Sequence, residues 1–196
     1  MSEQERSDWN RRYLEGRYSP RPSPFSLLEQ RIDRLPRGRA LDVACGTGRN
    51  ALFLARHGYQ VEAVDVAAEA LRQGEEHARA EGLDVDWTEA DLDDYTPPEG
   101  RYAVVVNCFY LNRKLLPLLT SALVEGGYIF VEQHLRTPLP VSGSREWRLE
   151  PNELLHMLGG LRVLHYQEGI ARDEDAGRDR DIAVVRMVAC NGSGGF

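Results

Sequence analysis

The sequence lacks the features that would place the protein in a membrane or outside the cell. None of its apolar runs approaches the ~20 residues that a helix needs to cross a bilayer. The segment from Met1 to Asp8 is polar and partly acidic, unlike a secretory signal. Both absences favour a cytoplasmic protein, and we expect no membrane among its partners.

Cysteine is scarce. Only Cys45, Cys108 and Cys190 are present, and they are far apart in the sequence. No CxxC pair or cysteine–histidine cluster indicates a metal site, so no metal is predicted. An odd number of cysteines in a protein expected to be cytoplasmic argues for free thiols rather than for a disulfide framework.

An excess of positive charge is also missing. The formal net charge of the 196 residues is -7, and acidic residues are interleaved with the arginines throughout. A nucleic-acid-binding protein usually carries a basic stripe that neutralises phosphates, and none is evident. We therefore expect no nucleic acid partner. The hydrophobic content of 42% and charged content of 28% are ordinary for one globular domain with one core.

Apolar runs of strand length alternate with longer amphipathic stretches along the middle of the chain. The pattern predicts strands at residues 39–43, 60–64, 85–88, 102–106 and 128–132, and helices at residues 50–57, 67–81 and 115–124. Several connections contain glycine, and the 102–106 strand is almost continuously apolar. Such alternation indicates an α/β fold with a parallel sheet covered by helices on both faces.

The two ends of the chain follow other patterns. A helix at 151–158, strands at 161–167 and 182–188, and a charged connection at 172–181 are predicted near the C-terminus. Near the N-terminus, helices at 8–16 and 25–35 flank a proline-rich linker at 19–24. We expect residues 1–38 to form a helical segment, residues 39–190 the main domain, and residues 191–196 a flexible tail.

Two glycines mark a candidate ligand loop. Gly46 and Gly48 follow the first predicted strand and open a helix. Glycine permits a tight turn and lets backbone N–H groups approach a ligand closely. The pattern Gly46-x-Gly48-x-x-Ala51 also satisfies the dinucleotide fingerprint, so the loop by itself does not separate a nucleotide site from a plain strand–helix turn.

Three acidic residues near the predicted strand ends narrow the choice. Asp65 ends the second strand, where a carboxylate can accept hydrogen bonds from two ribose hydroxyls. The alternative is that Asp65 caps the next helix. Asp42 precedes the loop and would repel a pyrophosphate but suit a cationic methionine group. Asp91 follows the third strand and can accept a hydrogen bond from an adenine amino group. The alternative is that Asp91 is a solvated residue of a turn. Together they favour S-adenosyl-L-methionine over a dinucleotide.

The segment from Leu41 to Asn50 resembles the first motif of class I S-adenosylmethionine-dependent methyltransferases. Gly126 to Glu132 is similar to the glycine turn and fifth strand of that family. Trp9 to Tyr13 and Phe109 to Pro117 are similar to segments of its tellurite-resistance-type group of small bacterial proteins, whereas Glu132 to His134 departs from that group. The resemblance implies a Rossmann-like, doubly wound sheet of seven strands, mostly parallel with an antiparallel last strand.

The predicted site has a cofactor side and an acceptor side. For S-adenosyl-L-methionine we expect contacts from Tyr13, Asp42, Ala44, Cys45, Gly46, Thr47, Gly48, Asn50, Asp65, Val66, Ala90, Asp91, Leu92, Asn107 and Cys108. Tyr110, Arg113 and His134 are predicted to face a small-molecule acceptor.

Several of these residues keep two interpretations. His134 is either a general base or a surface histidine. Cys108 is either reactive or a small packing residue. Trp9 and Tyr13 either form a lid that excludes water or attach the N-terminal helix to the core.

The residues favour methyl transfer by in-line displacement, which needs alignment more than a strong catalytic constellation. An NAD-type oxidoreductase using the same loop and a non-catalytic S-adenosylmethionine-binding module are the alternatives. The sequence leaves the acceptor and the oligomeric state open.

Overall fold

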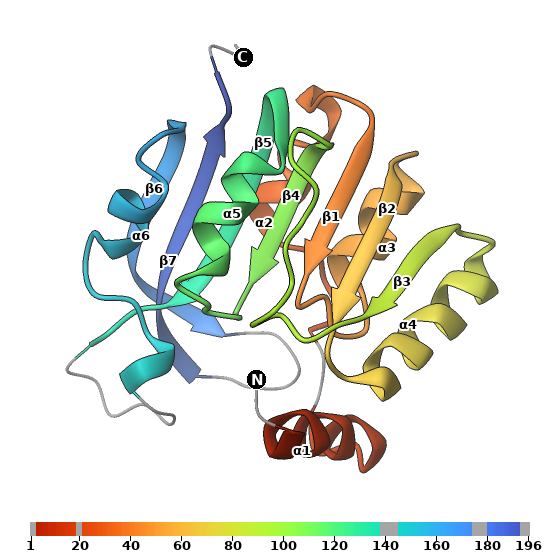
Figure 1. The fold of residues 1–196 in the computed structure, drawn as a ribbon. Helices are drawn as coiled ribbons and strands as arrows, with labels where there is room; N and C mark the ends of the chain where they lie inside the picture. Colours follow the sequence, from red (N-terminus) through yellow and green to blue (C-terminus); the bar gives the residue numbers. More distant parts are fainter. Residues whose placement is uncertain (1–2, 19–20, 138–144, 174–179, 193–196) are drawn as a thin grey trace.

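A central sheet organises the chain (Figure 1). The computed structural model describes residues 3–18, 21–137, 145–173 and 180–192. Its seven-stranded sheet has the order β3-β2-β1-β4-β5-β7-β6. The strands are β1 (Arg39–Val43), β2 (Gln60–Asp65), β3 (Val85–Glu89), β4 (Tyr102–Cys108), β5 (Leu123–His134), β6 (Arg162–Asp173) and β7 (Arg180–Cys190).

The pairing of these strands confirms the predicted fold class. Strands β1 to β5 pair in parallel with their neighbours. The last strand, β7, lies between β5 and β6 and runs antiparallel to both. The sheet is therefore mostly parallel with an antiparallel last strand, as the resemblance implied.

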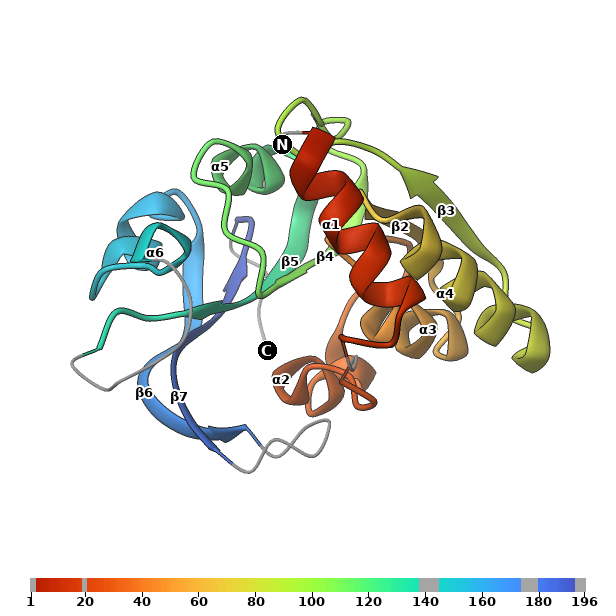
Figure 2. The same cartoon turned by 90° about the horizontal axis from the view of Figure 1, so that it is seen from below.

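Helices cover both faces of the sheet (Figures 1 and 2). They are α1 (Glu3–Leu14), α2 (Ser26–Glu29), the 3-10 helix η1 (Ile32–Arg34), α3 (Arg49–Arg56), α4 (Ala68–Glu81), α5 (Leu115–Ser121), the 3-10 helix η2 (Arg145–Trp147) and α6 (Glu153–Met157). Helices α5 and α6 cover one face, and α2, η1, α3 and α4 cover the other. Among the described residues, no helix combines the length and apolar character needed to cross a bilayer.

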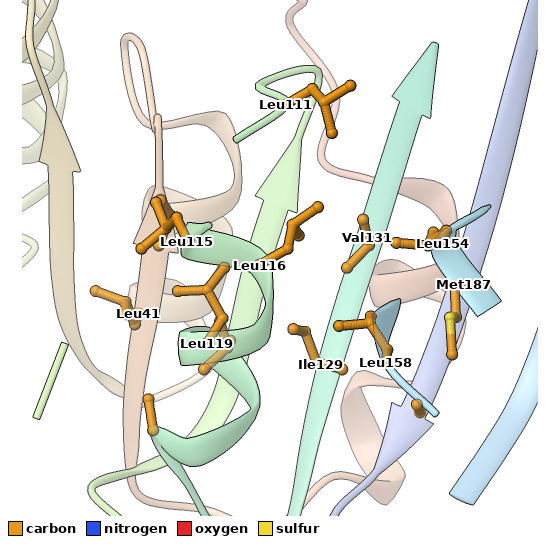
Figure 3. Close-up of a cluster of buried hydrophobic side chains, with 14 of the residues drawn as sticks. Leu41, Leu111, Leu115, Leu116, Leu119, Ile129, Val131, Leu154, Leu158 and Met187 are labelled. Carbon is orange, nitrogen blue, oxygen red and sulfur yellow. The ribbon is translucent and has the colours of Figure 1, made fainter. Parts of the chain in front are cut away.

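Burial on both faces explains the apolar strands. In β4, the side chains of Val104, Val105 and Val106 are fully buried, because successive side chains point to opposite helical layers. Figure 3 shows the layer in which Leu116 and Leu119 of α5 face Ile129 of β5. The core therefore holds the parallel strands in register, and their carboxyl ends lie along one edge.

The sequence predicted a single helix at residues 25–35 near the N-terminus, and this prediction is wrong. The chain forms α2 and η1 instead, with a break near Gln30. In one helix, Leu27 would lie roughly 100° away from the face of Leu28 and Ile32. The break allows all three side chains to be buried.

Two other boundaries differ from those predicted. The helix expected to reach Val124 ends at Ser121, because Leu123 is buried and pairs with Tyr102 at the start of a longer β5. The charged connection predicted from 172 to 181 is shorter, since the ladder of β6 and β7 includes the Arg172–Asp181 and Asp173–Arg180 pairs. Residues 174–179 lie outside the described part.

The predicted tail does not begin at residue 191. The backbone N–H of Asn191 donates to Gly127 O at 2.8 Å, and Asn191 O accepts from the N–H of Gly126 at 2.7 Å. Its side-chain amide also donates to the carbonyls of Leu123 and Val124, at 3.2 Å each. Asn191 is thus attached to β5, and residues 193–196 lie outside the described residues.

The N-terminal helix α1 lies across the carboxyl ends of the parallel strands (Figure 2). Asn10 Oδ1 accepts a hydrogen bond from the backbone N–H of Glu69 at 2.8 Å, in the first turn of α4. The side-chain amide of Gln73 donates to Tyr13 O at 3.5 Å. Helix α1 is therefore docked on α4, above the strand edge where ligands bind in such sheets.

Candidate active site

The glycine loop connects β1 to α3 through three residues in the left-handed backbone region. Ala44, Gly46 and Gly48 have φ values of 55°, 56° and 80°. This conformation costs little for glycine but is strained for alanine. Strained residues concentrate at ligand sites, where the surrounding structure holds them in place. The N–H of Cys45 donates to Val64 O at 3.1 Å and helps to hold this turn against β2.

Gly46 is required by a close approach as well as by its backbone. A Cβ at this position would lie 2.7 Å from the hydroxyl oxygen of Tyr13, closer than real Cβ contacts. Tyr13 comes from α1 and is buried. Helix α1 and the loop therefore form one wall together, and a side chain at residue 46 would push them apart.

Asp65 joins the end of β2 to this loop. Its Oδ2 accepts from the N–H of Gly46 at 2.8 Å, and its Oδ1 accepts from the N–H of Ala67 at 2.9 Å. Burial raises the pKa of the carboxyl, and these N–H groups oppose that rise. Asp65 therefore orders the turn before α4, in line with the capping interpretation, and also holds the loop; its ribose role stays a prediction.

Asp42 lies beneath the loop. Its Oδ2 accepts from the N–H of Ala51 at 3.0 Å, in the first turn of α3. Burial raises the pKa of Asp42 to about 7, although the guanidinium of Arg49 and the Ala51 N–H favour the charged form. Asp42 therefore supports the helix start and places a titratable charge under the pocket floor.

A pocket with a cavity volume of about 60 Å³ opens above the loop. It is lined by Tyr13, Tyr18, Arg21, Ala44, Cys45, Gly46, Thr47, Arg49, Asn50, Cys108 and Phe109. The lining combines the carboxyl ends of β1 and β4, the start of α3, and the N-terminal segment. It therefore brings together Tyr13, most of the predicted loop residues, Asn50 and Cys108.

Phe109 forms the wall at the end of β4. Its φ of 60° is unusual for a bulky residue, and its N–H donates to Glu132 O at 2.7 Å. The guanidinium carbon of Arg21 lies 4.0 Å from the centroid of the Phe109 ring. The ring of His134 lies 4.8 Å away at 44°. Phe109 thus connects the pocket to His134, which does not itself line it.

Eight residues predicted for the cofactor lie outside the pocket lining: Asp42, Gly48, Asp65, Val66, Ala90, Asp91, Leu92 and Asn107. Leu92 is buried in the core, as is Val66. Asp91 Oδ1 accepts from the N–H of Asp93 at 2.9 Å, as in an Asx turn. The N–H of Ala90 donates to Asp65 O at 3.0 Å, and Asn107 Oδ1 accepts from the amide of Gln133 at 2.6 Å.

Two predicted acceptor residues also lie away from the pocket. Arg113 forms an ion pair with Glu153 at 2.5 Å and donates to the carbonyls of Glu146 and Arg148, at 3.0 Å each. This guanidinium connects the start of α5 to the α6 region. The Tyr110 hydroxyl donates to Asp93 at 3.3 Å.

Cys108 lines the pocket as a neutral thiol. Burial raises its pKa to about 12, and the amide of Asn50 lies 3.8 Å from its sulfur. Reactive cysteines have thiolates stabilised by their surroundings. The environment therefore favours the interpretation of Cys108 as a packing residue.

The comparisons with known proteins agree with this geometry. A family model for the methyltransferase domain matches residues 40–127, which contain the loop, Asp65 and β4. A "Ubiquinone biosynthesis O-methyltransferase" of Idiomarina loihiensis is 25% identical over 178 residues, covering 87% of this chain and 71% of the relative.

These matches support the assignment of the chain to the class I S-adenosylmethionine-dependent methyltransferases. S-adenosylmethionine is therefore its cofactor.

Other relatives extend the comparison. A "Ribosomal RNA small subunit methyltransferase C" of Alcanivorax borkumensis is 39% identical over 111 residues, covering 52% of this chain but only 34% of the relative. The crystal structure of TehB from Haemophilus influenzae aligns with a TM-score of 0.73 at 22% identity, covering 93% of this chain and 67% of TehB. At that identity the likeness shows the fold.

The methyltransferase site contains four pocket residues that were absent from the predicted site: Tyr18, Arg21, Arg49 and Phe109. Arg49 follows the second glycine directly, so its place in the motif was the available signal. Tyr18 and Arg21 belong to the segment between α1 and α2, where no pattern in the sequence shows which side chains turn inward.

Trp87 of β3 was also missed. Cβ atoms at Gly48 and Gly74 would lie 2.3 and 2.6 Å from its ring. The indole therefore fills the space between the glycine loop and α4, and only the folded structure shows why both positions are glycine.

Proposed function

We propose that this methyltransferase transfers the methyl group of S-adenosyl-L-methionine to a small-molecule acceptor by in-line displacement. The observation that carries the proposal is the half-open pocket above the glycine loop, whose wall includes Tyr13, Tyr18 and Arg21 of the chain's own N-terminal segment. A pocket walled in part by these residues suits a small acceptor that is held beside the cofactor and partly shielded from water.

The glycine loop is suited to the cofactor. The close approach of Tyr13 to Gly46 leaves no room for a side chain there, and the buried Asp65 carboxylate lies at the end of β2. A carboxylate offers about four acceptor sites, so we assign Asp65 to the ribose hydroxyls. The bound cofactor supplies a methyl group on positively charged sulfur.

We propose roles for the other predicted cofactor residues from their positions in the fold. We assign Ala44, Cys45, Gly46, Thr47, Gly48 and Asn50 to the methionine and ribose portions, with Asp42 supplying negative charge from below. Val66, Ala90, Asp91 and Leu92 are assigned to the adenine side, and Asn107 and Cys108 to the end of β4.

The acceptor is assigned to the Phe109 side of the pocket. Phe109 and Arg21 line this side, and the His134 ring lies 4.8 Å from the Phe109 ring. We retain His134 as the candidate base for an acceptor that must lose a proton, and Tyr110 as a neighbouring contact. We assign Arg113 a structural role and no contact with the acceptor, because its guanidinium forms an ion pair with Glu153.

A hydroxyl-bearing small molecule is the first acceptor class to examine, because relatives named for ubiquinone biosynthesis carry the name O-methyltransferase. A ribosomal RNA acceptor is the second candidate, favoured only by the partial match to a methyltransferase of that name. The net charge of -7 counts against RNA, since phosphate binding needs basic side chains.

Methyl transfer from labelled S-adenosylmethionine, screened across small hydroxyl, thiol and amine acceptors, oxyanions and ribosomal RNA, tests this proposal. Turnover with a small molecule and none with RNA is expected. Transfer to RNA alone would overturn the small-molecule assignment. Tight binding of S-adenosylhomocysteine without transfer to any class would favour the non-catalytic alternative, and binding of NAD would favour the oxidoreductase.

The domain division and the location complete the proposal. We retain an N-terminal covering segment at residues 1–38 and a methyltransferase domain at residues 39–190, with the domain extended to include Asn191. A cytoplasmic location is proposed because Cys45, Cys108 and Cys190 form no disulfide with one another.

A further inference from the structure

Arg21 connects three segments that are far apart in the sequence. Its guanidinium forms an ion pair with Asp173 at 2.8 Å, near the end of β6. The same guanidinium lies over the ring of Phe109, at the end of β4. Arg21 itself follows α1 and precedes α2. The N-terminal segment, the middle of the sheet and the C-terminal hairpin therefore meet at this side chain.

The Arg21–Asp173 pair differs from the ion pair between Arg172 and Asp181 in this hairpin. The side chains of Arg21 and Asp173 are 11% and 2% exposed, whereas those of Arg172 and Asp181 are 47% and 56% exposed. Exposed pairs contribute little, but breaking a buried pair is strongly unfavourable because one charge loses its partner. Of these two described pairs, the Arg21 pair is thus the more costly to open.

The N-terminal segment is fixed on both sides of the pocket. On one side, Asn10 and Tyr13 hold α1 on α4 through Glu69 and Gln73. On the other side, Arg21 reaches Asp173. The residues between these points include Tyr18, which lines the pocket. The described residues of the N-terminal segment are therefore attached on α4 and on Asp173, and Tyr18 lines the pocket.

The Phe109 ring supports the Arg21 end of this span. A planar guanidinium stacks on an aromatic face, whereas a lysine ammonium does not reproduce that geometry. Phe109 keeps a strained backbone while lining the pocket. Its position is explained if the ring has to face both the pocket and Arg21.

We propose that Arg21 is a positioning residue that closes the active site, with Asp173 as its anchor and Phe109 as its support. While the pair is formed, the N-terminal segment stays over the pocket and retains the cofactor or its product. Opening the pair frees that end of the segment. The inference rests on the proposed function, because it takes this pocket as the place where the cofactor binds.

The release rate of S-adenosylhomocysteine tests the inference, measured by surface plasmon resonance on the full chain. Arg21→Gln and Asp173→Asn are each expected to release it about 10- to 100-fold faster than the unmodified protein. The double variant should be no faster than either single variant, because both remove one interaction. Arg21→Lys keeps the charge but loses the stacking, so it should release the product faster than the unmodified protein as well.

Arg172→Gln is the matched control, because it removes an exposed pair from the same hairpin, and its release rate should not change. The unfolding temperature of each variant, measured in parallel, distinguishes an effect on closure of the pocket from an effect on folding stability. Lower unfolding temperatures with unchanged release rates would overturn the inference and leave Arg21 a structural residue. If Asp173→Asn does not fold, Arg21→Gln tests the same pair from the segment outside the sheet. Absence of S-adenosylhomocysteine binding by the unmodified protein would instead contradict the proposed function.

Discussion

The carboxylate of Asp65 accepts a hydrogen bond from the backbone N–H of Gly46 at 2.8 Å, and this contact joins the end of β2 to the glycine loop. One side chain therefore shapes the loop, and the proposed function also assigns it to the ribose of the cofactor. Losing it affects both properties, which makes Asp65 the most informative position in the site.

Replacing Asp65 with Ala should weaken S-adenosylhomocysteine binding by about 10- to 100-fold, because hydrogen bonds to a charged group contribute roughly 1.5–3 kcal/mol each. Asp65→Asn should lose less, since it keeps one acceptor oxygen for a backbone N–H. Isothermal titration calorimetry measures both affinities. Asp86→Ala, at an exposed position of β3, is the control. Unchanged affinity in Asp65→Ala would refute the ribose assignment.

Gly46→Ala should destabilise the protein and weaken cofactor binding. The new Cβ would lie 2.7 Å from the Tyr13 hydroxyl, and a φ of 56° adds roughly 1–2 kcal/mol of backbone strain. Gly58→Ala is the matched control, because Gly58 has a φ of 79° with no atom within 4 Å of a Cβ. Urea unfolding and calorimetry should show similar backbone strain in both variants but a loss of binding only in Gly46→Ala.

A second substitution separates the two effects at Gly46. Tyr13→Phe removes the hydroxyl, and the next nearest ring carbon is 3.7 Å from the added Cβ. The double variant Gly46→Ala/Tyr13→Phe should therefore recover part of the lost affinity. If Tyr13→Phe brings no recovery in this background, the contact between α1 and the loop is not what requires glycine.

The pKa of Asp42, raised to about 7 by burial, predicts a pH dependence of stability. An unfolded aspartate titrates near ~3.9, so between about pH 4 and 7 the folded state binds the additional proton. The free energy of unfolding should therefore decrease as the pH rises through this window. Urea unfolding at several pH values measures the trend, and Asp42→Asn should flatten it. An equally steep trend in Asp42→Asn would assign the effect to other groups.

The same carboxyl predicts a difference between the methyl donor and its product. A positively charged sulfonium near Asp42 favours the charged carboxylate, so binding of S-adenosylmethionine should release a proton near pH 7. S-adenosylhomocysteine lacks that charge and should release less. Calorimetry in buffers of different ionisation enthalpy measures the released protons. Equal release for both ligands would place Asp42 too far from the sulfur to sense its charge.

Gly74→Ala should destabilise this protein even though alanine is the better helix former by roughly 1 kcal/mol. Gly74 lies within α4, where an added Cβ would meet the Trp87 ring at 2.6 Å and Thr47 O at 3.0 Å. Overpacking of this kind costs about 1–3 kcal/mol. Urea unfolding should show a smaller loss when the same substitution is made in a Trp87→Leu background. An equal loss in both backgrounds would exclude the indole as the cause.

The sequence predicted the alternating core of this fold closely. The strand predicted at residues 39–43 coincides with β1, and the helix predicted at 67–81 differs from α4 by one residue. These elements are local patterns of apolar spacing and glycine stops, which chain composition alone can express. The split of the 25–35 helix escaped the same reasoning, because it depends on burying Leu27 against a surface assembled from distant strands.

The candidate site divides in the same way. Gly46, Gly48 and Asp65 could be predicted from the sequence because a strand–loop–helix turn and an acid at the next strand end are short-range patterns. Arg21 and Phe109 were missed as site residues because their importance arises from contact with each other and with Asp173, 152 positions beyond Arg21.

By itself, the sequence determined the succession of most strands and helices along the chain, the glycine loop and the kind of cofactor, since each depends on residues close together in the chain. Only the tertiary structure decided which side chains enclose the pocket, that Arg113 is held by Glu153, and that Arg21 reaches Asp173 over Phe109. The physical reason is that burial and pairing depend on which surfaces the folded chain brings together.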